Sequence, residues 1–234
     1  MASYFNLTLD TLAPAGLAIN LNDNAQYCTS TAVTLKTTLT DADTTGYQMK
    51  VWGIASADDP AVALEEAAAA WETFEAEKAI NLTTGDGLKT VHVKVRDAVG
   101  NESAEATDDI TLNSVVPVVT VTGPDKATVS KVAGFDAAIV SFICDVPFVE
   151  YKVCVVPENA SLENAGVVIP TDGGSVNTSG LVDLDTDPDA ELFPAATNIQ
   201  VTINGTDLET ASAGDGVKIV KVFVKNEAGT WSLA

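Results

Sequence analysis

His92 is the single histidine of this 234-residue sequence, and it is the first candidate for acid–base chemistry. A catalytic dyad or triad needs a base that is held by hydrogen bonds beside a nucleophile. His92 instead alternates with valines and shares its side of the alternation with Lys94 and Arg96. This pattern predicts a surface residue on a strand, and we expect the chain not to be an enzyme.

Two short acidic runs could supply oxygen ligands to a cation. In one of them Asp41 and Asp43 alternate with other residues, and the other run contains Asp183, Asp185, Asp187 and Asp189. Ca²⁺ takes about six to eight oxygen ligands, and alternating carboxylates can supply some of them. The second run is not an EF-hand, because Pro188 stands where that motif needs glycine. Calcium is therefore the cofactor to consider, at Asp41 and Asp43 or at Asp183, Asp185 and Asp187. The alternative is that these are solvated acidic loops.

The cysteines do not suggest a metal site. Structural zinc needs about four Cys, His or carboxylate ligands in register, whereas the chain has three scattered cysteines, Cys28, Cys144 and Cys154. An odd number of cysteines fits free thiols that pack as small buried hydrophobic residues. A bridge between Cys144 and Cys154 across a hairpin is the alternative.

The aromatic residues favour structural roles over sugar binding. Glycoside hydrolysis would need paired carboxylates in a cleft with aromatic platforms, and only 6% of the residues are aromatic. We expect Trp52 and Trp71 to pack together over one end of a sandwich. Trp231 is expected to be exposed and to contact a partner, because Trp is enriched at interface hot spots.

The net charge argues against two classes of partner. Twelve basic residues stand against 33 acidic ones, which gives a formal charge of −21. Affinity for nucleic acid depends largely on Lys and Arg, and anionic membranes attract the same residues, so we expect neither partner. The first residues lack the charged and apolar regions of a signal peptide. No stretch approaches the ~20 apolar residues of a membrane helix.

A segment that occurs twice indicates which elements position these residues. Residues 85–103 align without a gap on residues 214–232, at a constant offset of 129 positions, and a fixed offset marks repeated modules. Each copy has a Gly-Asp-Gly turn, an alternating strand and a second turn with glycine. The alternation predicts one face in a core and one in solvent. The predicted core residues are Val91, Val93, Val95, Val220, Val222 and Val224, and the predicted solvated ones are His92, Lys94, Arg96, Lys221, Phe223 and Lys225.

The remaining patterns predict an all-β fold of two tandem immunoglobulin-like β-sandwiches. Residues 1–13 are assigned to an N-terminal strand or linker, residues 14–114 to the first domain and residues 115–234 to the second, with a long insertion at 157–195. Asp58, Asp59 and Pro60, followed by an Ala- and Glu-rich run to Trp71, predict a short helical insertion in the first domain. Strands are expected near residues 16–21, 31–40, 45–53, 78–83, 88–97 and 106–113, and near residues 117–122, 137–145, 148–156, 197–203 and 217–226.

Three stretches of the first domain carry a resemblance to a known family. They are residues 9–16 (LDTLAPAG), 40–53 (TDADTTGYQMKVWG) and 85–103 (GDGLKTVHVKVRDAVGNES). Together they resemble the Ig-like repeats of tailed-bacteriophage virion proteins, and similar repeats occur in bacterial surface proteins. Residues 117–232 share the resemblance mainly through their final strand. The resemblance implies a structural or adhesive protein without catalysis, which decorates a capsid, sits on a tail or fibre, or contacts a host surface.

The expected function is that of a capsid decoration or auxiliary protein of a tailed phage, assembled in the host cytoplasm and carried in the virion. Its partners would be other virion proteins such as the major capsid protein. An adhesin, fibre or tail module that binds a host surface or a glycan is the first alternative. A carbohydrate-active accessory protein or enzyme is the second.

The two ends of the sequence suggest how such a partner would bind. Asn6-Leu-Thr-Leu-Asp10 matches Asp109-Ile-Thr-Leu-Asn113 at an offset of 103 positions, and the second domain ends soon after Ser232, so that it is expected to lack its own last strand. An uncovered sheet edge invites an added strand. We therefore expect residues 4–10 or the open edge to pair with another copy or a virion partner, through Tyr4, Phe5, Leu7 and Leu9. The alternative is that the N-terminal residues lie along their own domain.

Overall fold

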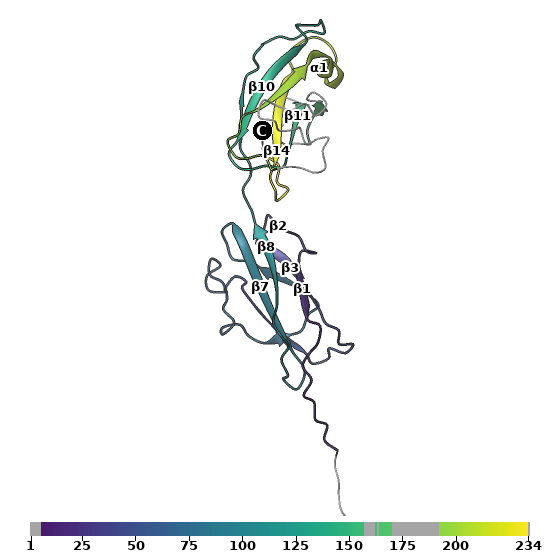
Figure 1. The fold of residues 1–234 in the computed structure, drawn as a ribbon, viewed down its shortest axis with the longest axis vertical. Coiled ribbons are helices and arrows are strands. Elements are labelled where there is room, and N and C mark those ends of the chain that lie inside the picture. The colour runs from purple at the N-terminus through teal and green to yellow at the C-terminus, as the bar shows by residue number, and fades with distance from the viewer. Residues whose placement is uncertain (1–5, 157–161, 163, 170–191, 234) are drawn as a thin grey trace, which may run out of the picture. The chain divides into compact units, whose positions relative to one another are not determined.

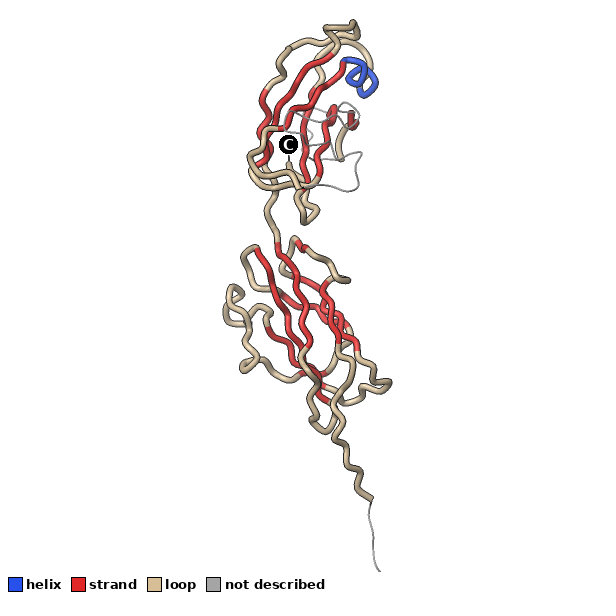
Figure 2. Tube along the Cα trace, in the orientation of Figure 1, coloured by secondary structure: helices blue, strands red, loops and turns tan. Residues whose placement is uncertain are grey.

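The computed structural model describes residues 6–156, 162, 164–169 and 192–233. The chain divides into two compact units, Met1–Ser114 and Val115–Ala234, which we call module one and module two. Strands dominate both modules, and the described residues contain one helix, α1 (Gly205–Ala211), in module two (Figure 2).

Module one consists of two sheets (Figure 1). The first has the order β1-β3-β6, from β1 (Ala18–Leu21), β3 (Ala32–Thr38) and β6 (Glu77–Asn81). The second has the order β2-β8-β7-β4-β5, from β2 (Tyr27–Cys28), β8 (Ala106–Leu112), β7 (Gly87–Arg96), β4 (Gln48–Trp52) and β5 (Glu72–Thr73). All neighbours are antiparallel except β2 and β8.

The core of module one lies between these sheets and follows the alternation of the strands. Val91, Val93 and Val95 on β7 are all fully buried, as predicted. They pack in one cluster with Met49 and Val51 of the neighbouring β4 and with apolar residues of the facing sheet, which include Leu21, Leu35 and Ile80. Because side chains alternate between the two faces of a strand, the residues between these valines point away from the core.

Module two also consists of two sheets, but each has three strands. The first has the order β13-β10-β9, from β13 (Ile199–Asn204), β10 (Ala137–Cys144) and β9 (Val119–Thr122). The second has the order β12-β11-β14, from β12 (Val167–Ile169), β11 (Glu150–Val156) and β14 (Ile219–Lys225). Helix α1 follows β13 directly.

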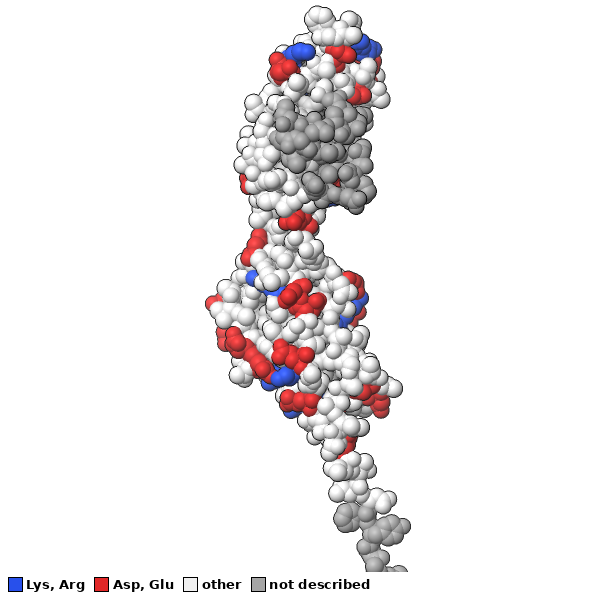
Figure 3. Space-filling view, viewed as in Figure 1, with Lys and Arg blue, Asp and Glu red and all other residues white. Residues whose placement is uncertain are grey.

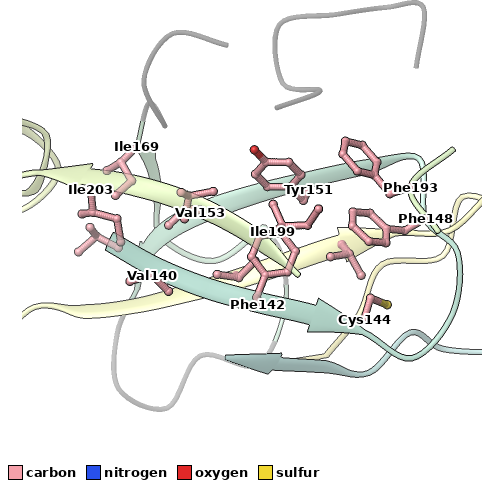
Figure 4. Close-up of a cluster of buried hydrophobic side chains, with 14 residues drawn as sticks. Val140, Phe142, Cys144, Phe148, Tyr151, Val153, Ile169, Phe193, Ile199 and Ile203 are labelled. Carbon is pink, nitrogen blue, oxygen red and sulfur yellow. The ribbon is translucent and has the colours of Figure 1, made fainter. Parts of the chain in front are cut away.

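Aromatic side chains fill the core of module two (Figure 4). Phe142 of β10 and Tyr151 of β11 lie with ring centroids 5.2 Å apart, and Phe148 stacks on Phe193 at 4.7 Å. Figure 4 shows Phe142, Tyr151 and Ile199 pointing toward one another from different strands. Such pairs stabilise a core beyond the area that they bury, by roughly 0.5–1.5 kcal/mol each.

The strand orders define the architecture of both modules. In immunoglobulin notation module one has an A-B-E sheet and an A′-G-F-C-C′ sheet, and module two has an A-B-E sheet and an F-C-C′ sheet. The prediction of an all-β chain with two immunoglobulin-like sandwiches is confirmed. The three cysteines are buried and form no disulfide, as predicted.

The short helix or helical turn expected in module one is limited to a single turn, in which Ala69 N–H donates to Glu65 C=O (3.0 Å). The segment from Gly53 folds back on itself: Leu64 N–H donates to Ile54 C=O (2.7 Å), and Gly53 N–H donates to Leu64 C=O (2.9 Å). An isolated bridge joins Ala55 and Ala63. This backbone pairing holds the residues up to Leu64 out of a helix, so the helix propensity of Ala and Glu is expressed only in the turn that follows.

Phe223 was predicted to be solvated, and this is wrong. It is fully buried and forms a second cluster of module two with Cys154 and Val156, against which Ile219 and Trp231 pack. β11 carries apolar residues on both of its faces here, and so both faces of the β11–β14 pair are covered. Val222 and Val224 are buried in the main core as predicted, whereas Val220 is only partly buried.

Candidate interaction surface

The turn after the repeated strand has the same hydrogen bonds in both modules. Ser103 N–H donates to Val95 C=O, and Ser232 N–H donates to Val224 C=O, each at 2.8 Å. The serine Oγ accepts in return from the N–H of Val95 (3.0 Å) or of Val224 (3.1 Å). Both serines are buried. The repeat seen in the sequence is therefore a repeat of backbone geometry.

The first residue of this turn is an aspartate in module one, Asp97, and an asparagine in module two, Asn226. Asp97 Oδ1 accepts from Asn101 N–H, and Asn226 Oδ1 accepts from Thr230 N–H, both at 2.9 Å. Burial by itself would raise the pKa of Asp97, but hydrogen bonds from the side chain and backbone of Asn101 and from Val99 N–H outweigh it and hold this pKa below its usual range. Asn226 forms the same turn without a charge.

Beyond the turn the two modules differ at the sheet edge. β7 has a strand on each side, with β4 along one edge and β8 along the other. Its equivalent β14 pairs with β11, and in the part of the chain that the structure describes no strand is hydrogen-bonded to its other edge. β9, the end strand of the facing sheet, contacts β14 without pairing with it. That module two lacks a strand of this kind stays a prediction.

Val224 indicates which backbone groups of β14 face the open edge. Its N–H and C=O both bond to Ser232, on the side away from β11. Backbone groups alternate in direction along a strand, so those of Val222 and Val220 point the same way. In β7 the equivalent residues, Val93 and Val91, pair with Ala106 and Asp108 of β8. The open edge of β14 thus presents polar backbone groups that a further strand can bond.

The segment of residues 6–10 has no strand pairing of its own. Leu7 and Leu9 are each 87% exposed. Its last residue is held near module one, because Asn101 Nδ2 donates to Asp10 C=O (3.4 Å). Tyr4 and Phe5, which were predicted to join it at a partner, lie outside the described residues.

One face of the β4–β7 pair gathers the aromatic and basic residues of module one. Trp52 and His92 are cross-strand partners and stack with ring centroids 5.2 Å apart. His92 Nδ1 lies 2.6 Å from Glu105 Oε1. Trp52 is buried, whereas His92 is partly exposed on the outer face of β7, the side of the strand on which the sequence placed it.

Trp71 lies on the same face but takes different partners. Arg96 Cζ lies 4.5 Å and Lys50 Nζ 5.4 Å from the centre of its ring. The predicted packing of Trp52 on Trp71 is not among the ring contacts of the described residues. Lys94 donates to Glu66 (2.7 Å), and this hydrogen bond lowers the pKa of Glu66. Of these basic residues Lys94 is paired with a carboxylate, whereas Arg96 donates to Gln48 Oε1 (2.8 Å) and Lys50 to Glu66 C=O (3.3 Å).

Trp231 is partly buried rather than protruding. Lys152 Nζ lies 4.2 Å and Lys225 Nζ 5.2 Å from the centre of its ring, and Lys225 forms an ion pair with Glu150. An isolated bridge joins Trp231 to Lys225, as Glu102 is joined to Arg96 at the equivalent positions of module one. Trp231 therefore marks the end of the open edge of β14, and its role as a contact residue stays a prediction.

The acidic residues considered for calcium are engaged within the chain where the structure describes them. Asp41 Oδ2 accepts from Ala15 N–H (3.2 Å) and from the Tyr47 hydroxyl (3.3 Å). Asp43 Oδ1 accepts from Thr45 N–H (2.9 Å), and its bonds to Thr45 lower the pKa of Asp43. Asp183, Asp185 and Asp187 lie outside the described residues. Calcium binding stays a prediction.

Three further features of the described residues bear on chemistry. These residues contain no group of three or more His, Cys, Asp or Glu side chains placed to hold a metal ion, and no helix there is long and apolar enough to span a membrane. Burial raises the pKa of the Cys28 and Cys144 thiols, so they stay protonated and are poor nucleophiles. Figure 3 shows carboxylates scattered in small groups over the visible face of module one, several of them beside Lys or Arg.

No protein-family model matches the sequence, and no curated protein matches it. Among solved structures, the fibronectin(III)-like modules of CbhA from Clostridium thermocellum align over 92% of this chain and 88% of theirs, with 10% identity and a TM-score of 0.44. The D00-D0 domain of intimin aligns over 93% of this chain and 98% of its own, with 14% identity and a TM-score of 0.28. Chitinase ChiA74 from Bacillus thuringiensis aligns over 92% of this chain and 30% of its own, with 12% identity and a TM-score of 0.29. Likenesses at these scores carry no inference about the role of this chain.

Proposed function

We propose that this chain is a non-enzymatic structural protein of a tailed-phage particle, and that it decorates the exterior of the capsid through contacts with other virion proteins such as the major capsid protein. The observation that carries the proposal is that the described residues contain both an open strand edge, on module two, and an exposed apolar segment, before module one. Both features serve protein association. The resemblance of residues 9–113 to the Ig-like repeats of phage virion proteins supplies the context.

The chemistry of the described surface is consistent with that role. The one histidine is stacked and paired with a carboxylate, and the thiols are buried. A formal charge of −21 suits a soluble particle component that docks on a less acidic or basic protein surface. Assembly in the host cytoplasm and residence in the virion follow from the same proposal, without nucleic acid or membrane as partner.

The decisive experiment separates assembled particles into capsids, tails and fibres and quantifies this chain in each by mass spectrometry. The proposal expects a fixed copy number on capsids that survives a high-salt wash. Its presence in the fibre or tail fraction alone would favour the alternative of a host- or glycan-binding adhesin, and its absence from purified particles would reject both.

Turnover is the second test of the proposal. A screen of the purified chain against glycan, peptide and ester substrates is expected to give no activity above buffer. Activity that a single carboxylate substitution abolishes would overturn the non-enzymatic reading and favour a carbohydrate-active protein.

A further inference from the structure

We propose that residues 6–10 of one copy of the chain add as a strand to the open edge of β14 in a second copy. The added strand would take the place that β8 has beside β7 in module one. This inference concerns self-association and does not depend on where the protein acts.

The acceptor is the edge that β14 leaves unpaired in the described residues. β7 runs from Gly87 to Arg96 and pairs with β8 from Gly87 to Val93. β14 begins only at Ile219, three positions after the equivalent of Gly87, Gly216. The first three residues of the stretch that β8 pairs in module one therefore have equivalents outside any strand in module two, as expected where no partner strand is bonded.

The core of module two is also less closed beside this edge. Val91 of β7 is fully buried, whereas its equivalent, Val220, is only partly buried. Val217 lies outside the core, as its equivalent Leu88 does, and it is 91% exposed against 66% for Leu88. A strand laid along this edge would cover the side of the sandwich that Val220 leaves open.

We assign residues 6–10 as the donor strand because their sequence resembles that of β8. Residues 6–10 match residues 109–113 at a constant offset of 103 positions, with Leu7 and Leu9 in the places of Ile110 and Leu112. In module one Ile110 and Leu112 are only 1% and 3% exposed, while Leu7 and Leu9 are each 87% exposed. The segment thus carries the apolar residues of an inward-facing strand without a core to bury them, and burial of such residues drives association.

The register of β8 on β7 fixes the register of the proposed pair. Ile110 pairs with Lys89 and Thr111 with Leu88. The two offsets place Leu7 opposite Lys218 and Thr8 opposite Val217. The backbone N–H and C=O of Val95 point toward Ser103, on the side of β7 where β8 lies. Because this direction alternates along a strand, the backbone groups of Leu88 point away from β8, and Leu88 and Thr111 form a non-hydrogen-bonded pair. Such a non-hydrogen-bonded pair brings the two Cα atoms to about 4.5 Å, within the range that a disulfide spans.

The experiment mixes two full-length variants, T8C and V217C, under mild oxidation. We expect a disulfide-linked dimer that contains one copy of each variant, identified by the cross-linked peptide in mass spectrometry. The native cysteines do not compete, because Cys28, Cys144 and Cys154 are all buried. The matched control mixes V217C with V99C, since Val99 is also well exposed but lies in a turn. Cross-linking in the control at the rate of the T8C mixture would overturn the proposal.

A second measurement tests association without any new bond. The sedimentation of the wild-type chain is expected to depend on concentration, and L7D/L9D is expected to weaken association by about tenfold or more, because carboxylates would enter a core. Thr8→Val, which keeps both leucines, should associate as the wild type does. A wild-type chain that stays monomeric at high concentration, with no mixed disulfide, would overturn the proposal.

The double variant T8C/V217C on one chain decides between a second copy and the same copy. Disulfide-linked multimers are the expected product. A closed monomer with an internal disulfide would show that the segment reaches the edge of its own module two, which would reject pairing between copies.

Discussion

β7 and β14 share a repeated segment, a turn and a buried serine, yet β7 lies inside a sheet and β14 lies at an edge of one in the described structure. The alternation of valines is enough to bury one face of each strand in a core. It does not decide whether a further strand covers the edge, because pairing along an edge depends on backbone groups that every sequence carries. The comparison teaches that a module can keep its fold while one of its edges remains available to a partner.

The largest expected effect comes from truncating Ile110 of β8, compared with truncating Leu7, which holds the matching position in residues 6–10. Ile110→Ala should destabilise module one by about 2–5 kcal/mol, because it removes buried apolar volume from β8. Leu7→Ala should change the stability of the dilute chain by less than about 0.5 kcal/mol, because that residue is exposed. Native-state hydrogen exchange measures both, since it reports each module separately. A large loss of stability in dilute Leu7→Ala would mean that the segment is already docked within its own chain.

The second prediction compares how much stability each module loses when one core valine of its repeated strand is truncated. Val93→Ala and Val222→Ala should each cost about 1–3 kcal/mol, from the lost transfer free energy and the cavity left behind. The cost should be larger at Val93, because β4 and β8 on both sides limit how far the cavity can collapse. Denaturation followed by hydrogen exchange distinguishes the modules. Equal losses at the two sites would show that the open edge does not soften module two.

The smallest effect concerns the pH dependence of the two turns. The folded pKa of Asp97 lies below its unfolded value of about 3.9. The stabilisation from this group is therefore fully present above that unfolded pKa, and it is lost as the pH falls toward the folded pKa. Module two has Asn226 in this position and lacks this contribution.

Asp97→Asn should make module one resemble module two in this respect. We expect a lower stability at neutral pH, because charge-assisted hydrogen bonds are lost, and a smaller further loss between about pH 5 and pH 2 than in the wild type. Chemical denaturation across that pH range, read by hydrogen exchange in module one, measures the slope. An unchanged slope would assign the acid sensitivity of module one to other carboxylates.

Much of the fold could be predicted from the sequence because its strands alternate cleanly. The valines of β7 lie in the core where the pattern placed them, and the expected strand near residues 137–145 corresponds to β10 (Ala137–Cys144). The turns that open the repeated segments could also be predicted from their glycines: Gly85 and Gly214 both adopt a positive φ, at 83° and 85°. Short strands such as β5 (Glu72–Thr73) carry too few residues for a pattern.

The features that were missed depend on pairing or on a second covered face. The stack of Trp52 on His92 follows from the register of β4 on β7, which no pattern within either strand contains. Phe223 looked solvated because it alternates with core valines, and only the apolar residues on the outer face of β11 explain its burial. The Ala- and Glu-rich run before Trp71 forms only one helical turn, because the residues up to Leu64 pair with the segment that begins at Gly53.

Residues 6–10 and the open edge of β14 belong to different modules of one chain, and this placement has a consequence for stoichiometry. A contact that joins two unlike surfaces is heterologous. Each such contact occupies the donor segment of one copy and the acceptor edge of another, so every copy in a pair keeps one of its two surfaces unoccupied or binds a further copy. Addition then continues from copy to copy and ends only when the chain of molecules closes into a ring or meets a copy that cannot donate. A variant without residues 1–10 would act as such a terminator, and a small fraction of it in a mixture would shorten every assembly.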